Sequence, residues 1–167
     1  MAHVYLAAGA GEALWFAGQR IIYKVRGREG EATIFELVVG PHGGAPLHLH
    51  RTQDETHYIL EGRFRFHCAG EAFVAESGAV VHVPKGVPHG FANLGSESGT
   101  ILCLETHPGP LEAFFDEVGE DAADTWSLLP RPLAMRTLLA AARRTGGLEI
   151  LMPGLGASDD VLPSRTD

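Results

Sequence analysis

The sequence lacks the features that mark membrane-spanning and disulfide-stabilised proteins. It contains no uninterrupted apolar run of the ~18 residues that a membrane-spanning helix requires. Its N-terminal stretch has no basic leader, and Glu12 breaks the apolar run there, so we expect no signal peptide. The two cysteines, Cys68 and Cys103, are too few for a disulfide framework. We therefore expect buried free thiols in a cytoplasmic protein that has no membrane partner.

Positive charge is also scarce. Thirteen Lys and Arg stand against 21 Asp and Glu, which gives a formal net charge of −8, and the basic residues form no cluster. Because a phosphate backbone attracts clustered basic side chains, we expect no nucleic-acid partner. The remaining composition, 45% apolar and 20% charged, is ordinary for a globular protein. A length of 167 residues predicts one domain with a substantial core.

Strand-like segments fill the first two thirds of the chain. Between residues 4 and 104, short runs rich in β-branched and aromatic residues alternate with turn signals such as Glu61-Gly62 and Ser77-Gly78. In residues 63–68 the alternation places Phe64 and Phe66 on one face and charged side chains on the other. Many short strands at regular spacing predict an all-β sandwich or barrel whose interior holds these phenylalanines.

The pattern changes to amphipathic helices after Thr106. Apolar residues recur at helical spacing twice, first at Leu111, Phe114, Phe115 and Val118 and then at Met135, Leu138, Leu139 and Ala142. The second stripe has to be buried, either on the outer sheet of the barrel or against a second subunit, and it favours a homodimer. We divide the chain into a β-barrel with its exit helix (1–119), a linker with a C-terminal helix (120–153) and a polar, Gly-rich tail expected to be disordered (154–167).

Histidines at strand spacing indicate a metal site. His48 and His50 are two residues apart, so on an extended strand both imidazoles point to the same face. Glu55 follows after a short bend. Three such ligands enclose a metal ion poorly, and His89 is the candidate for a fourth. Imidazole and carboxylate together suit one divalent transition-metal ion, such as Fe, Mn, Ni, Co or Zn, better than Ca²⁺ or Mg²⁺.

Side chains beside this site are candidates for catalysis and for the substrate pocket. Glu55 could accept a proton from a substrate hydroxyl as a general base, in addition to binding the metal. His57 shares the strand parity of Glu55 and therefore points the same way. It hydrogen-bonds substrate, orients Glu55, or is a buried imidazole paired with a backbone carbonyl. Phe64, Phe66 and Phe91 are either core residues or walls of the pocket.

Two motifs of fixed spacing resemble the signatures of the cupin superfamily. The first comprises His48, His50, Glu55 and Gly62, and the second comprises Gly78, Pro84, Gly86, His89 and Asn93. One departure occurs six residues before His48, where the family pattern has glycine and this sequence has His42 followed by Gly43. Over roughly residues 12–119 the chain is similar to the single-domain cupins called quercetin dioxygenase-like.

The resemblance implies a fold and a function. The implied fold is the double-stranded β-helix, an antiparallel jelly-roll barrel. The implied activity is a metal-dependent dioxygenase that acts on a small aromatic or enol/diol-type molecule. Because this superfold hosts many chemistries, a second class of function stays open. In that alternative, the protein is a metal-dependent isomerase or cyclase, or a module that only binds a small molecule.

Overall fold

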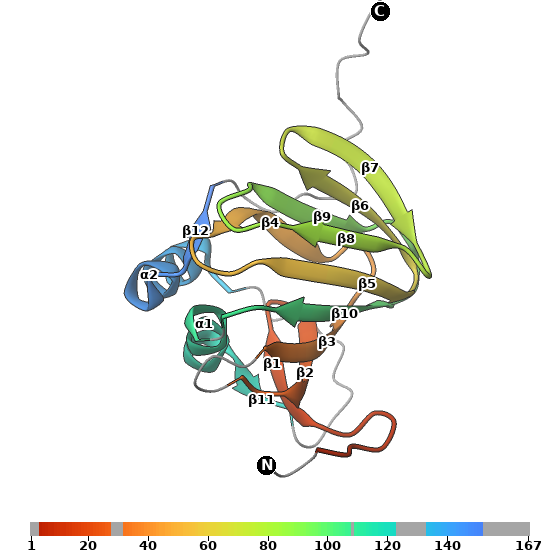
Figure 1. Ribbon diagram of the computed structural model, residues 1–167, viewed down its shortest axis with the longest axis horizontal. Coiled ribbons are helices and arrows are strands. Elements are labelled where there is room, and N and C mark those ends of the chain that lie inside the picture. The colour runs from red at the N-terminus through yellow and green to blue at the C-terminus, as the bar shows by residue number, and fades with distance from the viewer. Residues whose placement is uncertain (1–3, 28–31, 108, 123–132, 152–167) are drawn as a thin grey trace, which may run out of the picture.

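Two antiparallel β-sheets face each other, and two helices lie at one end of the pair (Figure 1). The computed structural model describes residues 4–27, 32–107, 109–122 and 133–151. The larger sheet contains, in spatial order, β11 (Glu120–Asp121), β1 (Glu12–Phe16), β2 (Gln19–Val25), β3 (Thr33–Val39), β10 (Gly99–Glu105), β5 (Glu55–Glu61) and β8 (Val80–Val83). The smaller sheet contains β12 (Leu148–Ile150), β4 (Gly44–His50), β9 (His89–Asn93), β6 (Arg63–Cys68) and β7 (Glu71–Glu76). This architecture confirms the predicted all-β jelly roll with C-terminal helices.

The core lies between the two sheets and follows from strand alternation. Along β3 and β10 every second residue is buried, as expected when one face of a strand points inward. In β6 the side chains of Phe64 and Phe66 are fully buried, at 0% exposed, so the predicted orientation of this strand is confirmed. Both cysteines are free thiols, with Cys103 buried in β10 and Cys68 partly buried in β6.

The turn before β4 is short, because β3 ends at Val39 and β4 begins at Gly44. Gly44 pairs with Ala92 of β9, and a Cβ atom at Gly44 would lie 2.0 Å from the carbonyl oxygen of Phe91. Only glycine permits this approach. His42 has a φ of 57°, the left-handed conformation that glycine adopts most easily, which explains why the cupin pattern has glycine there. The Nδ2 atom of Asn93 stabilises the turn by donating hydrogen bonds to the carbonyl oxygens of Val39 and Gly40.

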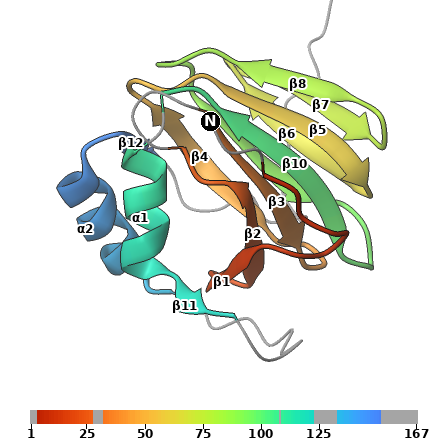
Figure 2. The same cartoon turned by 60° about the horizontal axis from the view of Figure 1, so that its bottom comes forward.

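The two helices occupy the regions predicted for them. α1 (Pro110–Val118) begins with a proline at its first turn, and α2 (Met135–Thr145) ends at Gly146 in the left-handed conformation. They pack against each other between β1 and β12 (Figure 2). Leu138, 6% exposed, is buried in this packing and belongs to the main core. The stripe of α2 is therefore covered within the chain and no longer supports a homodimer, which stays a prediction.

A short strand that the sequence did not reveal connects the C-terminal region to the barrel. β12 pairs with β4, with Leu148 opposite His50 and Ile150 opposite His48. Hydrogen bonds from Arg51 N to Gly147 O (2.8 Å) and from Leu151 N to Leu47 O (2.7 Å) extend this pairing. The predicted disordered tail, 154–167, and most of the predicted linker lie outside the described residues. Among the described residues, no helix has the length and hydropathy needed to cross a membrane.

We expect Gly44→Ala to lower the free energy of unfolding by about 1–3 kcal/mol, the usual cost of forcing a methyl group into a filled position. Gly40→Ala is the matched control, because its Cβ atom would meet nothing closer than the Gly18 carbonyl oxygen at 3.6 Å. That variant should change stability by less than about 0.5 kcal/mol. Urea unfolding measures both values, and equal effects of the two substitutions would contradict the close approach of β4 to β9.

Candidate metal centre

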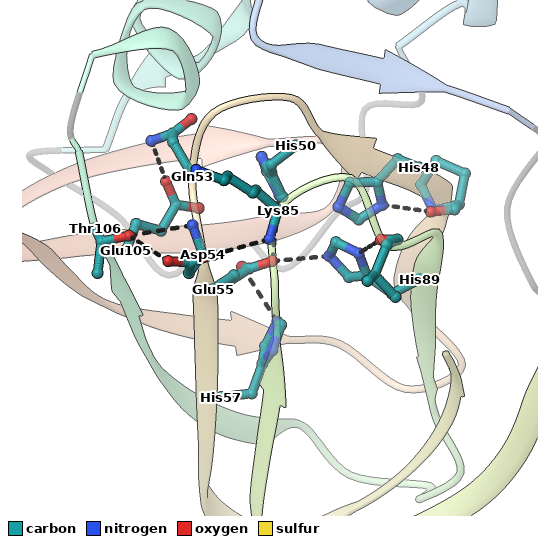
Figure 3. Close-up of polar contacts among 12 residues, drawn as sticks. His48, His50, Gln53, Asp54, Glu55, His57, Lys85, His89, Glu105 and Thr106 are labelled. Atoms are coloured by element: carbon teal, nitrogen blue, oxygen red, sulfur yellow. Dashed lines mark hydrogen bonds and ion pairs between the residues drawn. The ribbon is translucent and has the colours of Figure 1, made fainter. Parts of the chain in front are cut away.

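Four side chains from three strands converge between the sheets. His48 and His50 extend from β4, Glu55 from the start of β5 and His89 from the start of β9, and each offers a ligand atom within 4.8 Å of all the others (Figure 3). The pairing of β4 with β9 places His48 directly opposite His89. β5 belongs to the facing sheet, so Glu55 reaches the histidines across the interior. The structure thus brings together all four predicted ligands in one candidate metal-binding cluster.

The carboxylate of Glu55 is surrounded by imidazoles. Its Oε2 atom lies 2.9 Å from His89 Nε2 and 3.2 Å from His50 Nε2. Its Oε1 atom lies 3.2 Å from Nε2 of His57, which points at Glu55 from farther along β5 (Figure 3). The two oxygens therefore have different surroundings, since Oε2 faces the predicted ligands and Oε1 faces His57.

Backbone carbonyl groups orient two of the imidazoles. Nδ1 of His48 lies 2.7 Å from the carbonyl oxygen of Pro46, and Nδ1 of His89 lies 2.9 Å from that of Val87. Because a carbonyl oxygen only accepts hydrogen bonds, each Nδ1 atom carries the hydrogen. Nε2 is then the atom through which each ring could bind a metal ion, with the ion taking the place of the proton that His89 Nε2 shares with Glu55.

The pKa values of the cluster suit metal binding. Burial alone would raise the pKa of Glu55, but the neighbouring imidazoles of His57, His50 and His89 lower it well below its usual range. Burial, together with the charges on His89 and His50, lowers the pKa of His48 well below its usual value. Burial lowers the pKa of His89, but its hydrogen bond to Glu55, the charge of Glu55 and its hydrogen bond to Val87 together raise it. The lowered pKa values favour the carboxylate of Glu55 and the neutral imidazole of His48, which are the forms that bind metal. Of these three residues, only His89 has a pKa shift that makes a proton compete with the metal ion.

The cluster opens into an apolar cavity of about 70 Å³. His48, His50, Glu55 and Gln19 are its only polar lining side chains among the described residues. Both sheets and both helices supply the remaining lining residues, which are Phe16, Phe35, Leu37, Ala45, Pro46, Phe91, Leu111, Phe114, Phe115, Leu138, Leu148 and Ile150. Apart from these donor residues and Gln19, the lining of the cavity is therefore hydrocarbon.

Only one of the four residues predicted to form a substrate pocket lines the cavity. Phe91 lines the cavity, whereas Phe64, Phe66 and His57 do not. All three are buried behind the cluster, and the His57 ring packs against Phe66 and Phe91 at centroid distances of 5.3 and 5.7 Å. A direct contact of His57 with substrate is not supported by this position, because β5 carries the ring away from the cavity. Its contact with Glu55 matches the orienting role, and its Nδ1 atom has no hydrogen-bond partner among the described residues.

A second group of possible ligands, which sequence reasoning missed, consists of Glu55, His57 and Cys103. Cys103 lies opposite His57 in the pairing of β10 with β5. Burial, aided by the charges of Glu55 and Glu105, raises the pKa of the Cys103 thiol well above its usual value. Because the thiolate is the form that binds metal, this group is the weaker candidate.

A buried acid beside the cluster was also missed. Glu105 lies opposite Glu55, is 1% exposed and accepts a 2.7 Å hydrogen bond from Gln53 Nε2. Burial, with the charges of Glu55 and Glu112, raises the pKa of Glu105 well above its usual range. The raised pKa favours the neutral acid, a form that adds no second negative charge beside Glu55. The signal was available, since strand alternation places Glu105 on the inward face of β10 with Cys103.

Comparisons with known proteins identify related sequences. Residues 35–105 match the family model described as a cupin domain. An uncharacterized protein of Methanocaldococcus jannaschii is 33% identical over 76 residues, and the quercetin 2,3-dioxygenase of Bacillus subtilis is 33% identical over 89 residues. These matches cover 46% and 52% of this chain but 61% and 26% of the two relatives. The chain therefore spans less than two thirds of either protein.

Solved structures share the fold at low sequence identity. KdgF from Halomonas sp. matches with a TM-score of 0.56 and 15% identity, covering 64% of this chain and 96% of that one. An RmlC-like cupin from Shewanella frigidimarina matches with a TM-score of 0.55 and 19% identity, covering 64% and 91%. Both likenesses concern the arrangement of strands. Together with the two spaced motifs and the paired antiparallel sheets, the match shows that residues 35–105 of this chain form a cupin domain.

Proposed function

We propose that the protein is a dioxygenase that holds one divalent transition-metal ion at His48, His50, Glu55 and His89 and oxidises a small organic molecule. The observation that carries this proposal is the buried set of three imidazoles and one carboxylate at the end of an apolar cavity. The similarity to a quercetin 2,3-dioxygenase over 89 residues favours oxygen chemistry over the alternatives.

The donor set is consistent with Fe, Mn, Ni, Co or Zn, which accept mixed imidazole and carboxylate ligands. Four protein ligands leave one or two positions free on an ion that prefers five or six. When bound, the ion would supply these positions to dioxygen or to oxygen atoms of the substrate. Carbonyl groups of Pro46 and Val87 orient the His48 and His89 rings, so two of the imidazoles are held in place before any ligand arrives.

Glu55 is the candidate for proton transfer in this reaction. A carboxylate with a strongly lowered pKa is a weak base at neutral pH, so Glu55 would accept a substrate proton only when its contacts with the imidazoles loosen. His57, which contacts Oε1, is the candidate for holding the carboxylate in one orientation during that change. We therefore assign His57 a positioning role.

The cavity narrows the substrate class. No lysine or arginine lines it among the described residues, so a phosphate or a free carboxylate away from the metal ion would find no counter-charge there. The apolar walls favour a compact molecule with two adjacent oxygens at one end, such as an enol or a diol. The metal-dependent isomerase or cyclase, and the binding module that does not react with oxygen, remain the alternatives that the experiments below separate.

We expect the wild-type protein to bind one transition-metal ion per chain after reconstitution. His50→Ala and Glu55→Gln should each weaken metal binding at least about 100-fold. That loss is larger than the one caused by removing a residue that only hydrogen-bonds to a ligand. His82→Ala is the control, because His82 is exposed and bonds to Thr56. Elemental analysis after dialysis measures the metal content of the wild type and of each variant. Undiminished metal in both ligand variants would contradict the assignment.

Oxygen uptake separates the two classes of function. With the metal-loaded chain and a panel of catechols, flavonols and smaller enols, we expect consumption of dioxygen that disappears in Glu55→Gln and in His89→Ala. An oxygen electrode follows the reaction, with the apo chain as the blank. Binding of a panel member without any oxygen consumption would instead identify a non-oxygenase cupin.

The positioning role of His57 predicts a third result. His57→Ala should retain the metal and lower the turnover number about tenfold, within the range known for residues that orient a metal ligand. His57→Gln keeps an N–H donor for Glu55 and should recover part of the activity. Metal content and turnover are measured on the same samples. If His57→Ala loses its metal as readily as His50→Ala does, His57 is not an orienting residue.

A further inference from the structure

A buried glutamine lies in the wall of the cavity away from the metal ligands. Gln19 begins β2 and is only 4% exposed, yet it contributes to the cavity lining. Its Nε2 atom donates a hydrogen bond of 3.0 Å to the carbonyl oxygen of Gly44. Its Oε1 atom is buried without a hydrogen-bond partner among the described residues. A residue that lines the cavity therefore carries an acceptor whose hydrogen-bonding capacity is unused.

The chemistry of the Gly44 contact determines which amide atom is free. A carbonyl oxygen accepts hydrogen bonds and cannot donate them, so the nitrogen of the amide has to face Gly44. The other amide atom, Oε1, is then the one left over. Because an unsatisfied buried acceptor destabilises the folded state, a donor brought in by a ligand would remove that penalty.

Gln19 and three of the metal ligands line the same cavity from different strands. Gly44, which the amide contacts, is the first residue of β4, and His48 follows four residues later on that strand. Four residues of extended strand span about 13 Å. All lining side chains other than Gln19 and the three metal ligands are apolar among the described residues. The cavity therefore has two polar regions, Gln19 and the metal ligands, and the rest of its lining is hydrocarbon.

We propose that Gln19 is a ligand-binding residue whose Oε1 atom accepts a hydrogen bond from a hydroxyl or N–H group of the substrate. The ligand class is a compact molecule with metal-binding oxygens at one end, a single hydrogen-bond donor at the other and an apolar middle. This inference rests on the proposed metal site and adds a second contact to it. It makes Gln19 a determinant of specificity, because a buried acceptor discriminates against analogues that lack the matching donor.

Two small pyranones test this contact directly. Kojic acid and allomaltol have the same pair of chelating oxygens and differ by one hydroxyl group on the substituent across the ring. With the full chain loaded with Co(II) and kept free of oxygen, we expect calorimetric titration to show kojic acid bound about three- to tenfold more tightly, the effect of one neutral hydrogen bond. Equal affinities, tighter binding of allomaltol, or no binding of either probe to the Co(II)-loaded chain would overturn the assignment.

Two variants attribute the preference to Gln19. Gln19→Met removes Oε1 at similar volume and should bring the two affinities to within about twofold, and its melting temperature shows whether it folds. Gln53→Met is the matched control, since Gln53 is also a buried glutamine with an unpaired Oε1 but does not line the cavity. It should keep the preference for kojic acid. Loss of the preference in both variants would overturn the proposal, and the wild-type comparison decides alone if Gln19→Met does not fold.

The outcomes also separate this inference from the function on which it rests. If the chain takes up no Co(II), both fail. If Co(II) binds and the two probes are not distinguished, only the role of Gln19 fails. If the probes are distinguished but no substrate of this class supports oxygen consumption, Gln19 binds ligand as proposed and the dioxygenase activity is what fails.

Discussion

A carboxylate buried among imidazoles is the constraint on which the rest of this structure depends. Glu55 is 5% exposed, and moving a carboxylate out of water costs several kcal/mol unless nearby groups compensate. The compensation comes from His50 and His89 at one oxygen and His57 at the other. Because Glu55 belongs to one sheet and two of these histidines belong to the other, the interaction connects both halves of the barrel. Hydrogen bonds between Glu55 and the imidazoles require protons on the rings, and a bound metal ion would replace those hydrogen bonds by coordination. For this reason we regard the cluster as a binding site and not only as a polar part of the core.

Segments outside the matched cupin domain enclose the site. The donors lie within residues 35–105, but Gln19 precedes that range, and α1, α2 and β12 follow it. These flanking segments supply Phe114, Leu138 and Leu148 to the cavity wall. β12 is hydrogen-bonded to β4, with its residues opposite His48 and His50, so the C-terminal region contacts the ligand strand itself. The candidate ligands thus all lie within the matched cupin domain, whereas part of the cavity wall comes from segments outside it.

Much of the centre could be predicted from the sequence because strand geometry is periodic. The two-residue spacing of His48 and His50 fixes a common face, and the alternation in β6 fixes which face holds Phe64 and Phe66. Contacts between segments distant in the sequence could not be predicted in this way. The sequence does not state that β12 pairs with β4, that α2 is covered by α1, or that Gln19 shares a cavity with His48, because each depends on how separate elements pack. His57 shows the limit most clearly. Strand alternation predicts that it points to the same side as Glu55, whereas its packing against Phe66 and its absence from the cavity lining depend on how the strands pack.

X-ray absorption spectroscopy of the Zn(II)-loaded chain tests the central claim most directly, because it measures the atoms around the ion itself. The account predicts nitrogen and oxygen neighbours at about 2.0–2.1 Å, the outer-shell scattering of three imidazole rings and no sulfur. The competing group of Glu55, His57 and Cys103 would place a sulfur neighbour at about 2.3 Å with a single imidazole. A spectrum with that sulfur distance, or with fewer than three imidazoles, would contradict the assignment of His48, His50, Glu55 and His89 as the metal centre.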